Sequence, residues 1–405
     1  MSATFVIVGA GMAGGKAAET LREAGFDGRI VLVGAEPERP YERPPLSKDY
    51  LRGESERVGA YLQEDPGWYD EHQVELRTGA TVESLDVGAR AVVFAGDERI
   101  AYDALLLTTG AEPKRPPIPG ADLEGVHLLR TLEDSDGLRA VLQRGGRLVI
   151  VGAGWIGCEV AASARQRGME VAVVEPQSVP LEGVLGAELG AFYRDVHADH
   201  GVALHLGTGV EAIEGSGRAE RVRCSDGTTL DADAVLLAVG VAPRTALAEG
   251  VLDVDNGIVV DSGLRTSADG VFAAGDVANH HHPLFGRLRV EHWANALEQG
   301  PAAARAMLGQ DVTYDRVPYF FSDQYDVGME YAGHSRPGDE VVFRGDPAGR
   351  EFVAFWLRDG RVAAGMNVNV WDVNEQIQAL VRSGASVDQA RLRDPDVALD
   401  ELADA

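Results

Sequence analysis

The chain contains the same glycine-rich turn twice, and this repeat constrains its fold more than any other feature. Residues 9–16 read GAGMAGGK, and residues 152–159 read GAGWIGCE. In the spacing GxGxxG the first glycine allows a tight bend, the second lets a pyrophosphate approach the backbone, and the third lets helix and strand pack closely. These glycines are Gly9, Gly11 and Gly14 in the first turn, and Gly152, Gly154 and Gly157 in the second. The repeat therefore predicts two dinucleotide sites in one chain.

The segments around the turns strengthen this prediction, because a lone GxGxxG is often only a glycine-rich loop. TFVIVG precedes the first turn, AGGKAAETLREAG has helical spacing, and RIVLVGAE reads as a second buried strand. RLVIVGAGWIGCEVAASARQRGMEVAVVE repeats the order of strand, turn, helix and strand. Each copy predicts a βαβ unit with parallel strands and a right-handed crossover.

An acidic residue follows each turn by about 20 positions, at the tip of the second strand, as a dinucleotide site requires. These residues are Glu36 and Glu175. A carboxylate there accepts hydrogen bonds from the ribose hydroxyls and repels a 2′-phosphate. Because Pro176 and Gln177 follow Glu175 and neither could hold such a phosphate, the second site is predicted to prefer NADH over NADPH. The alternative is an ordinary surface glutamate at a strand end.

The order of these segments predicts an α/β fold with two Rossmann-like dinucleotide-binding domains and a C-terminal α+β domain. Both halves close on an apolar strand followed by glycine, in YDALLLTTG and in ADAVLLAVG, which ends at Gly240. The first domain is expected to comprise residues 1–112 and 241–310, interrupted by a second domain of residues 113–240. Residues 311–405 would form the third domain. The proline-rich residues 37–48 are predicted to be a loop.

Composition excludes several classes of partner. A net charge of −27 and a pI near 4.7 disfavour nucleic acid and anionic membrane surfaces, which repel an acidic protein. No segment approaches the roughly 20 apolar residues that span a bilayer. The N-terminus has no export-signal pattern, so a cytoplasmic protein is expected.

The cysteines and histidines suggest no metal site. Cys158 and Cys224 are far apart and in no CxxC spacing, so neither a disulfide framework nor a metal cluster is expected. Cys158 is predicted to be a small buried apolar residue on a helix. The run NHHHP, residues 279–283, is predicted to be a loop, because no carboxylate or thiol accompanies it at ligand spacing.

Four further stretches resemble a known family. TSADGVFAAGD (266–276) resembles the GD box of flavoproteins with two dinucleotide-binding domains. RPPLSK (43–48), VEHWANALEQG (290–300) and SDQYD (322–326) resemble NADH-dependent, FAD-containing ferredoxin reductases of bacterial oxygenase systems, of the putidaredoxin reductase and biphenyl dioxygenase reductase type. The resemblance runs from the first strand to about residue 370.

The resemblance implies which residues bind each cofactor. Around FAD it places Gly9, Gly11, Ala13, Gly14, Glu36, Arg43, Lys48, Val82, Arg130, Asp276 and Trp293. Around NADH it places Gly152, Gly154, Gly157, Glu159, Glu175 and Gly240. Asp276 would bind the ribityl chain, and Trp293 would lie against the isoalloxazine. Lys48 and Glu159 would pair beside flavin N5 as the catalytic residues. Without the resemblance, Lys48 would read as a solvated loop lysine and Trp293 as a core aromatic residue.

The implied function is hydride transfer from NADH to bound FAD, then transfer of single electrons to a [2Fe–2S] ferredoxin. The ferredoxin would supply a monooxygenase or a ring-hydroxylating dioxygenase. The alternatives are an NADH oxidase, an NADH:quinone oxidoreductase, and a non-enzymatic flavoprotein that senses NADH. A monomer and a homodimer are both compatible with the sequence.

Two departures from the family bear on the partner. Tyr319 and Phe321 stand where the family usually has tryptophans. Ferredoxins are commonly acidic, as is this chain, so docking would need a local basic patch. The candidates are Arg43, Arg287, Arg289 and Arg316.

Overall fold

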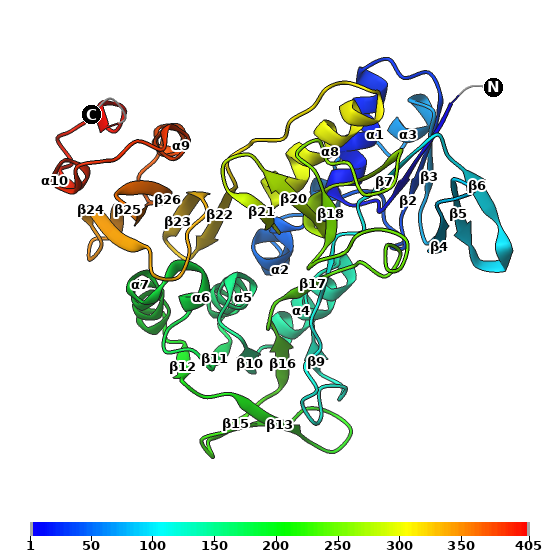
Figure 1. Ribbon diagram of the computed structural model, residues 1–405. Helices are drawn as coiled ribbons and strands as arrows, with labels where there is room; N and C mark the ends of the chain where they lie inside the picture. The colour runs from blue at the N-terminus through cyan, green and yellow to red at the C-terminus, as the bar shows by residue number, and fades with distance from the viewer. Residues whose placement is uncertain (1–2, 403–405) are drawn as a thin grey trace. The chain divides into compact units, whose positions relative to one another are not determined.

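The computed structural model describes residues 3–402, and the contacts of the chain divide it into two compact units. The first unit comprises Met1–Glu42, Arg57–Glu112 and Ala242–Pro318. The second comprises Arg43–Glu56, Pro113–Val241 and Tyr319–Ala405. Figure 1 shows the elements that make up each unit.

A five-stranded parallel sheet forms the core of the first unit, in the order β19-β7-β1-β2-β3. The central strand β1 (Thr4–Val8) pairs with β2 (Arg29–Val33) on one side and with β7 (Ala104–Leu107) on the other. All four residues of β7 are buried, which explains its continuous apolar run. The predicted βαβ unit of the N-terminal half is confirmed.

Helices α1 (Met12–Glu23) and α8 (Trp293–Met307) pack against each other in this unit. A Cβ atom on Gly300 of α8 would lie 2.3 Å from the backbone oxygen of Ala13 in α1. Only glycine therefore allows the two helices to approach so closely, which accounts for the last residue of VEHWANALEQG.

The remaining elements of the first unit surround this sheet. They are η2 (Arg57–Ala60), α3 (Trp68–Glu71), β3 (Val74–Arg77), β4 (Val82–Asp86), β5 (Ala91–Phe94), η3 (Ala95–Asp97), β6 (Arg99–Ala101), β18 (Ile258–Val260), β19 (Val271–Ala273), η4 (Gly275–Val277), β20 (Ala278–His282) and β21 (Gly286–Arg289). Strands β8 (Ala111–Pro113) and β17 (Val241–Pro243) lie where the chain passes from one unit to the other.

The second unit repeats the same parallel sheet in the order β12-β11-β10-β16-β9. Here β10 (Arg147–Val151) is central, between β11 (Glu170–Glu175) and β16 (Ala234–Leu237). Each half also carries a three-stranded antiparallel sheet before its closing strand, β4-β5-β6 in the first and β13-β14-β15 in the second. The internal repeat predicted from the glycine turns therefore extends through the topology of both halves.

The other elements of this part are helical or short. They are η1 (Pro44–Ser47), α2 (Asp49–Arg52), β9 (Val126–His127), α4 (Leu132–Arg144), α5 (Trp155–Gln166), α6 (Glu182–Leu185), α7 (Ala187–Asp199), β12 (Ala203–Leu206), β13 (Val210–Glu214), β14 (Arg221–Cys224) and β15 (Thr229–Asp231).

The C-terminal part of the second unit is an antiparallel sheet in the order β22-β23-β26-β25-β24, as the expected α+β class requires. Its strands are β22 (Tyr319–Gln324), β23 (Val327–Gly333), β24 (Glu340–Asp346), β25 (Glu351–Arg358) and β26 (Arg361–Val368). Helix α9 (Asn374–Ser383) packs on β23 and β26, and α10 (Gln389–Arg393) and η5 (Asp400–Leu402) follow it.

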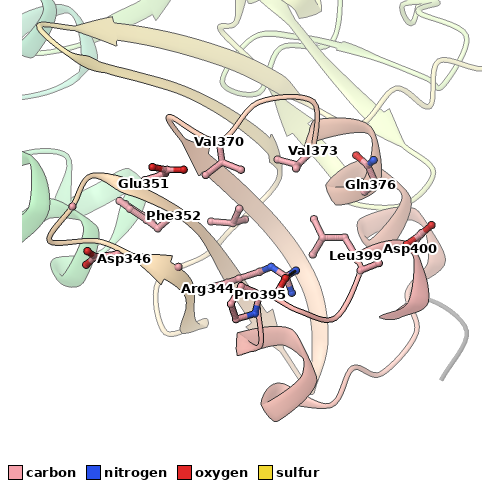
Figure 2. Close-up of a pocket in the computed structure, with 14 residues that line it drawn as sticks. Arg344, Asp346, Glu351, Phe352, Val370, Val373, Gln376, Pro395, Leu399 and Asp400 are labelled. Atoms are coloured by element: carbon pink, nitrogen blue, oxygen red, sulfur yellow. Dashed lines mark hydrogen bonds between the residues drawn. The ribbon is translucent and has the colours of Figure 1, made fainter.

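Arg344 of β24 fastens the C-terminal segment to this sheet. Its guanidinium donates to the backbone oxygens of Asp394 at 2.6 Å, Pro395 at 3.1 Å and Val397 at 2.6 Å. Beside it lies a cavity of about 530 Å³, lined by apolar side chains such as Val370 and Leu399 together with charged ones (Figure 2).

Two local predictions need correction. The NHHHP run is not a loop, because residues 278–282 form strand β20. His280 and His282 are buried and His281 between them is exposed, because successive side chains of a strand point to opposite faces. The proline-rich residues 37–48 are irregular for most of their length but contain the 3₁₀ helix η1, whose fixed proline φ angles suit a helix start. None of the helices within residues 3–402 is long and apolar enough to cross a membrane.

Candidate active site

The first glycine turn is held together by its first and third glycines. A Cβ atom on Gly9, which has a φ of +120°, would lie 2.1 Å from the backbone oxygen of Thr108. A Cβ atom on Gly14 would lie 2.0 Å from the oxygen of Gly9. Gly11 differs, because a Cβ there would have no atom within 4 Å. Packing explains Gly9 and Gly14, whereas Gly11 leaves open space in front of the backbone, where a pyrophosphate could approach.

The second turn has the same division of roles. Cβ atoms on Gly152 and Gly157 would lie 2.5 Å from the oxygen of Ala238 and 2.1 Å from the oxygen of Gly152, respectively. A Cβ atom on Gly154 would meet nothing within 4 Å. Both turns therefore fit a dinucleotide at their middle glycine.

The helices that follow the turns begin without a capping side chain. The N-cap residues are Gly11 for α1 and Gly154 for α5, and neither helix has an acidic residue in its first turn. Amide groups at such a helix start are unsatisfied within the helix and carry the positive end of its dipole. They are suited to bind the phosphates of a dinucleotide.

The two acidic strand tips have different surroundings. The hydroxyl of Tyr41 donates to Oε2 of Glu36 at 2.5 Å, and no motif in the sequence predicts this contact. Glu175 accepts from the backbone amides of Ala153 at 2.7 Å and Gln177 at 3.0 Å. These bonds fix the Glu175 carboxylate next to the second glycine turn and leave lone pairs on both oxygens for ribose hydroxyls.

Lys48 and Glu159 form a buried ion pair in the second unit. The Lys48 ammonium lies 2.8 Å from Oε2 of Glu159, and the two side chains are only 11% and 6% exposed. Ser47 Oγ donates to Oε2 of Glu159 at 2.5 Å, and Ser322 Oγ donates to Oε1 at 2.7 Å. A carboxylate withdrawn from water needs several such donors, and here three converge on it. The side chain of Lys48 also faces the ring of Phe321, with Nζ 5.8 Å from its centroid.

The segment that carries Lys48 is held by two helices of the same unit. Ser135 Oγ of α4 donates to the backbone oxygen of Leu46 at 2.8 Å, and Ser163 Oγ of α5 donates to that of Ser47 at 2.7 Å. Tyr50 donates to Asp136 at 2.6 Å. Glu159 itself projects from α5, so the helix that begins at the second glycine turn also supports its lysine partner.

The other residues expected around FAD are distributed over both units. Val82 begins β4, Asp276 lies in η4, and Trp293 is the first residue of α8, all in the first unit. Arg43 and Arg130 belong to the second unit, where the guanidinium of Arg43 donates to the backbone oxygen of Arg130. Their assigned contacts with FAD stay predictions. So does the role of Gly240, whose backbone oxygen accepts from the amide of Lys114 at 2.9 Å.

Both cysteines are buried, and so are the histidines His197, His280 and His282. Cys158 is 2% exposed in α5, as predicted, and burial raises the pKa of its thiol. Burial also lowers the pKa of His280 to about 4. No group of three or more potential metal-ligating histidines, cysteines or carboxylates occurs among residues 3–402.

Comparison with known proteins places the chain in a family. Residues 3–300 match the pyridine nucleotide-disulphide oxidoreductase family, and residues 319–403 match the reductase C-terminal family. The ferredoxin–NAD(+) reductase component of the anthranilate 1,2-dioxygenase system of Burkholderia cepacia is 39% identical over 400 residues, which cover 98% of each chain. Putidaredoxin reductase of Pseudomonas putida is 35% identical over 98% of this chain and 96% of its own length.

A solved structure agrees with these relatives. The covalent complex of putidaredoxin reductase with putidaredoxin contains a chain that matches with a TM-score of 0.95 and 35% identity, over 99% of this chain and 98% of that one. The chain therefore belongs to the pyridine nucleotide-disulphide oxidoreductase family and, within it, to the FAD- and NAD-dependent ferredoxin reductases of bacterial oxygenase systems.

Proposed function

We propose that this protein takes electrons from NADH and passes them singly to a [2Fe–2S] ferredoxin, which supplies a monooxygenase or a ring-hydroxylating dioxygenase. The observation that carries the proposal is the buried ion pair between Lys48 and Glu159, in which Glu159 lies on the helix of the second glycine turn. The relatives named above act in such systems, and one of them is solved together with its partner, putidaredoxin. A cytoplasmic location is part of the proposal, because NADH is the reductant.

The glycine turns would bind the two dinucleotides. In the first unit, the open space at Gly11 and the uncapped amides of α1 would hold the pyrophosphate of FAD, with Glu36 on its ribose. In the second unit, Gly154 and the start of α5 would hold NADH. Glu175 would accept from both ribose hydroxyls and disfavour the 2′-phosphate of NADPH.

Lys48 and Glu159 would act by position and charge. When bound, FAD supplies the conversion of a two-electron donor into single electrons, which no side chain performs. The protein then has to align the nicotinamide and keep water away from it. Lys48 and Glu159 are a buried pair of opposite charges, held in place by Ser47 and Ser322. They offer fixed polar groups against which the nicotinamide can align.

The proposal is tested by offering one purified preparation three electron acceptors. NADH oxidation is measured with a [2Fe–2S] ferredoxin from the same organism, with a quinone, and with air alone. We expect the ferredoxin to give the highest kcat/KM. Faster turnover with quinone or oxygen would instead identify a quinone reductase or an oxidase. A long-lived reduced protein with no turnover would identify a sensor.

A further inference from the structure

Three buried side chains and the partly buried Tyr325 form a series of hydrogen bonds that ends at Glu159. Ser322 Oγ lies 2.7 Å from Oε1 of Glu159, and Gln324 Nε2 lies 3.2 Å from that hydroxyl. Gln324 Oε1 lies 2.9 Å from Nε2 of His197, and the hydroxyl of Tyr325 lies 3.3 Å from Nδ1 of the same ring. We call this series of contacts the Glu159 relay; it runs from Tyr325 through His197, Gln324 and Ser322 to Glu159.

The charge of Glu159 fixes the direction of the first two hydrogen bonds. An ionised carboxylate only accepts, so the hydroxyl of Ser322 must donate its hydrogen to Glu159. The oxygen of Ser322 is then available only as an acceptor for Gln324. The amide of Gln324 must therefore point its nitrogen toward Ser322 and its oxygen toward His197.

The same logic fixes the tautomer of the histidine. Because Gln324 presents its oxygen, Nε2 of His197 must carry a hydrogen. Burial lowers the pKa of His197 to about 4, so the ring is neutral at pH 7 and Nδ1 is an acceptor. Burial also raises the pKa of Tyr325, so its hydroxyl keeps the hydrogen that it donates to Nδ1. All four donors of the Glu159 relay thus point toward the carboxylate.

The environment leaves these groups few alternative partners. Ser322, Gln324 and His197 are 2%, 1% and 1% exposed. Ser322 and Gln324 are two residues apart in β22 and both point to its buried face. His197 projects from α7. Buried polar groups that lose a partner cost roughly 1–3 kcal/mol, so reversing one member would force the others to turn or remain unsatisfied.

We propose that His197 is a positioning residue for Glu159, and that its Nε2–H tautomer orients the carboxylate through Gln324 and Ser322. The inference rests on the proposed function, in which Glu159 aligns the nicotinamide. The relay orients and does not conduct protons, because the amide of Gln324 would have to become an imidic acid to pass one on. The proposal therefore predicts that one set of hydrogen-bond directions is strongly preferred, and that this set holds the oxygens of Glu159 in place.

The tautomer can be observed directly, without turnover. In holoprotein labelled with ¹⁵N-histidine, the two ring nitrogens of His197 are identified by comparison with His197→Gln. We expect a protonated Nε2 and an unprotonated Nδ1 at pH 7. A hydrogen on Nδ1, or a cationic ring, would overturn the inference while leaving ferredoxin reduction, and hence the proposed function, intact.

An isosteric reversal gives the second test. In Gln324→Glu the side chain has the same shape but only accepts, so the hydroxyl of Ser322 would turn away from Glu159. We expect the KM for NADH to rise about tenfold, measured with ferricyanide as acceptor and with the flavin content unchanged. Gln378→Glu in α9 makes the same chemical change outside the relay and is the matched control.

A conservative replacement separates positioning from packing. His197→Gln retains a donor that can reach Gln324, whereas His197→Leu fills the space without a donor. We expect His197→Leu to raise the KM for NADH about tenfold more than His197→Gln does. Equal KM values in the two variants, or a Gln324→Glu variant that matches Gln378→Glu, would show that the relay does not position Glu159.

Discussion

The ammonium of Lys48 lies 2.8 Å from the carboxylate of Glu159, and both groups are almost completely withdrawn from solvent. Burying two charges costs free energy even when they are paired. If the pair served stability alone, apolar residues of similar size would stabilise the fold about as well. The place of Glu159 on the helix that follows the second glycine turn points instead to a role in function.

Replacing the lysine tests that role. Lys48→Ala removes the positive charge and leaves Glu159 with its two serine donors, so the nicotinamide loses part of its fixed contact edge. We expect reduction of the flavin by NADH to slow roughly 100-fold, as small misplacements of reacting groups do, with a smaller effect on folding. Stopped-flow absorbance measures the rate and thermal unfolding measures the stability. A wild-type reduction rate would contradict the assignment of Lys48.

The glycines of the second turn offer a matched pair of substitutions. Gly154→Ala adds a methyl group in open space, where NADH is proposed to bind, so the KM for NADH should rise at least about tenfold while the protein still folds. Gly157→Ala adds the same methyl group against the backbone of Gly152 and should destabilise the fold by about 1–3 kcal/mol. The KM for NADH and the thermal midpoint distinguish the two. Equal behaviour of the variants would refute the division of roles.

The choice between NADH and NADPH depends on Glu175. Glu175→Gln keeps the size of the side chain and its contact with Ala153 but removes the charge that repels a 2′-phosphate. We expect the ratio of kcat/KM for NADH to that for NADPH to fall about tenfold, because hydrogen bonds to a charged acceptor are worth about 1.5–3 kcal/mol. Glu182→Gln, at a partly exposed position of α6 in the same unit, serves as the control. An unchanged ratio would assign the preference to other residues.

The arginines expected to contact a ferredoxin differ in their exposure to solvent. Arg289 is 10% exposed and pairs with Glu291 at 2.5 Å, which leaves its charge largely neutralised. Arg316 is 64% exposed and lies 3.8 Å from Glu298. If ferredoxin docking is electrostatic, its second-order rate should fall as salt is added, and Arg316→Glu should slow it more than Arg289→Lys does. A rate independent of ionic strength would exclude these arginines from docking.

The sequence predicted the parts of the fold that follow from periodic patterns. The glycine spacings, the buried runs such as Ala104–Leu107 and the helix at Met12–Glu23 each have a local physical cause. Both glycine turns and the pair of Lys48 and Glu159 were anticipated as well. The pair could be expected only from the resemblance, because nothing in the local sequence indicates that a loop lysine meets a helix glutamate.

The supporting residues of the site were missed for a related reason. These residues come from three separate segments and meet only after folding: Ser47, His197, and the strand that carries both Ser322 and Gln324. The spacing of residues along the chain does not reveal hydrogen bonds between segments that are distant in sequence. Ser322 and Gln324 lie inside the SDQYD stretch, but that motif does not reveal that both side chains point to the buried face of a strand. The prediction of a loop for the NHHHP run is wrong because polar residues seldom form a mostly buried strand.

Buried histidines make the free energy of unfolding depend on pH. His197 and His280 both have pKa values lowered to about 4, and the usual value is 6.5. A histidine with a lowered pKa in the folded state stabilises the fold fully above its unfolded pKa, and this contribution is lost as the pH falls through 6.5 toward 4. At pH 5 each should have lost about 2 kcal/mol of its contribution to the free energy of unfolding.

Variants that cannot titrate should flatten this dependence. The free energy of unfolding is measured with urea between pH 5 and pH 8 for the wild type, His197→Gln and His280→Gln. His281→Gln, at an exposed position between two buried histidines, is the control and should follow the wild type. Because His197 and His280 lie in different units, their effects should add in the double variant. The same pH slope in the wild type, the three single variants and the double variant would mean that other groups govern acid unfolding.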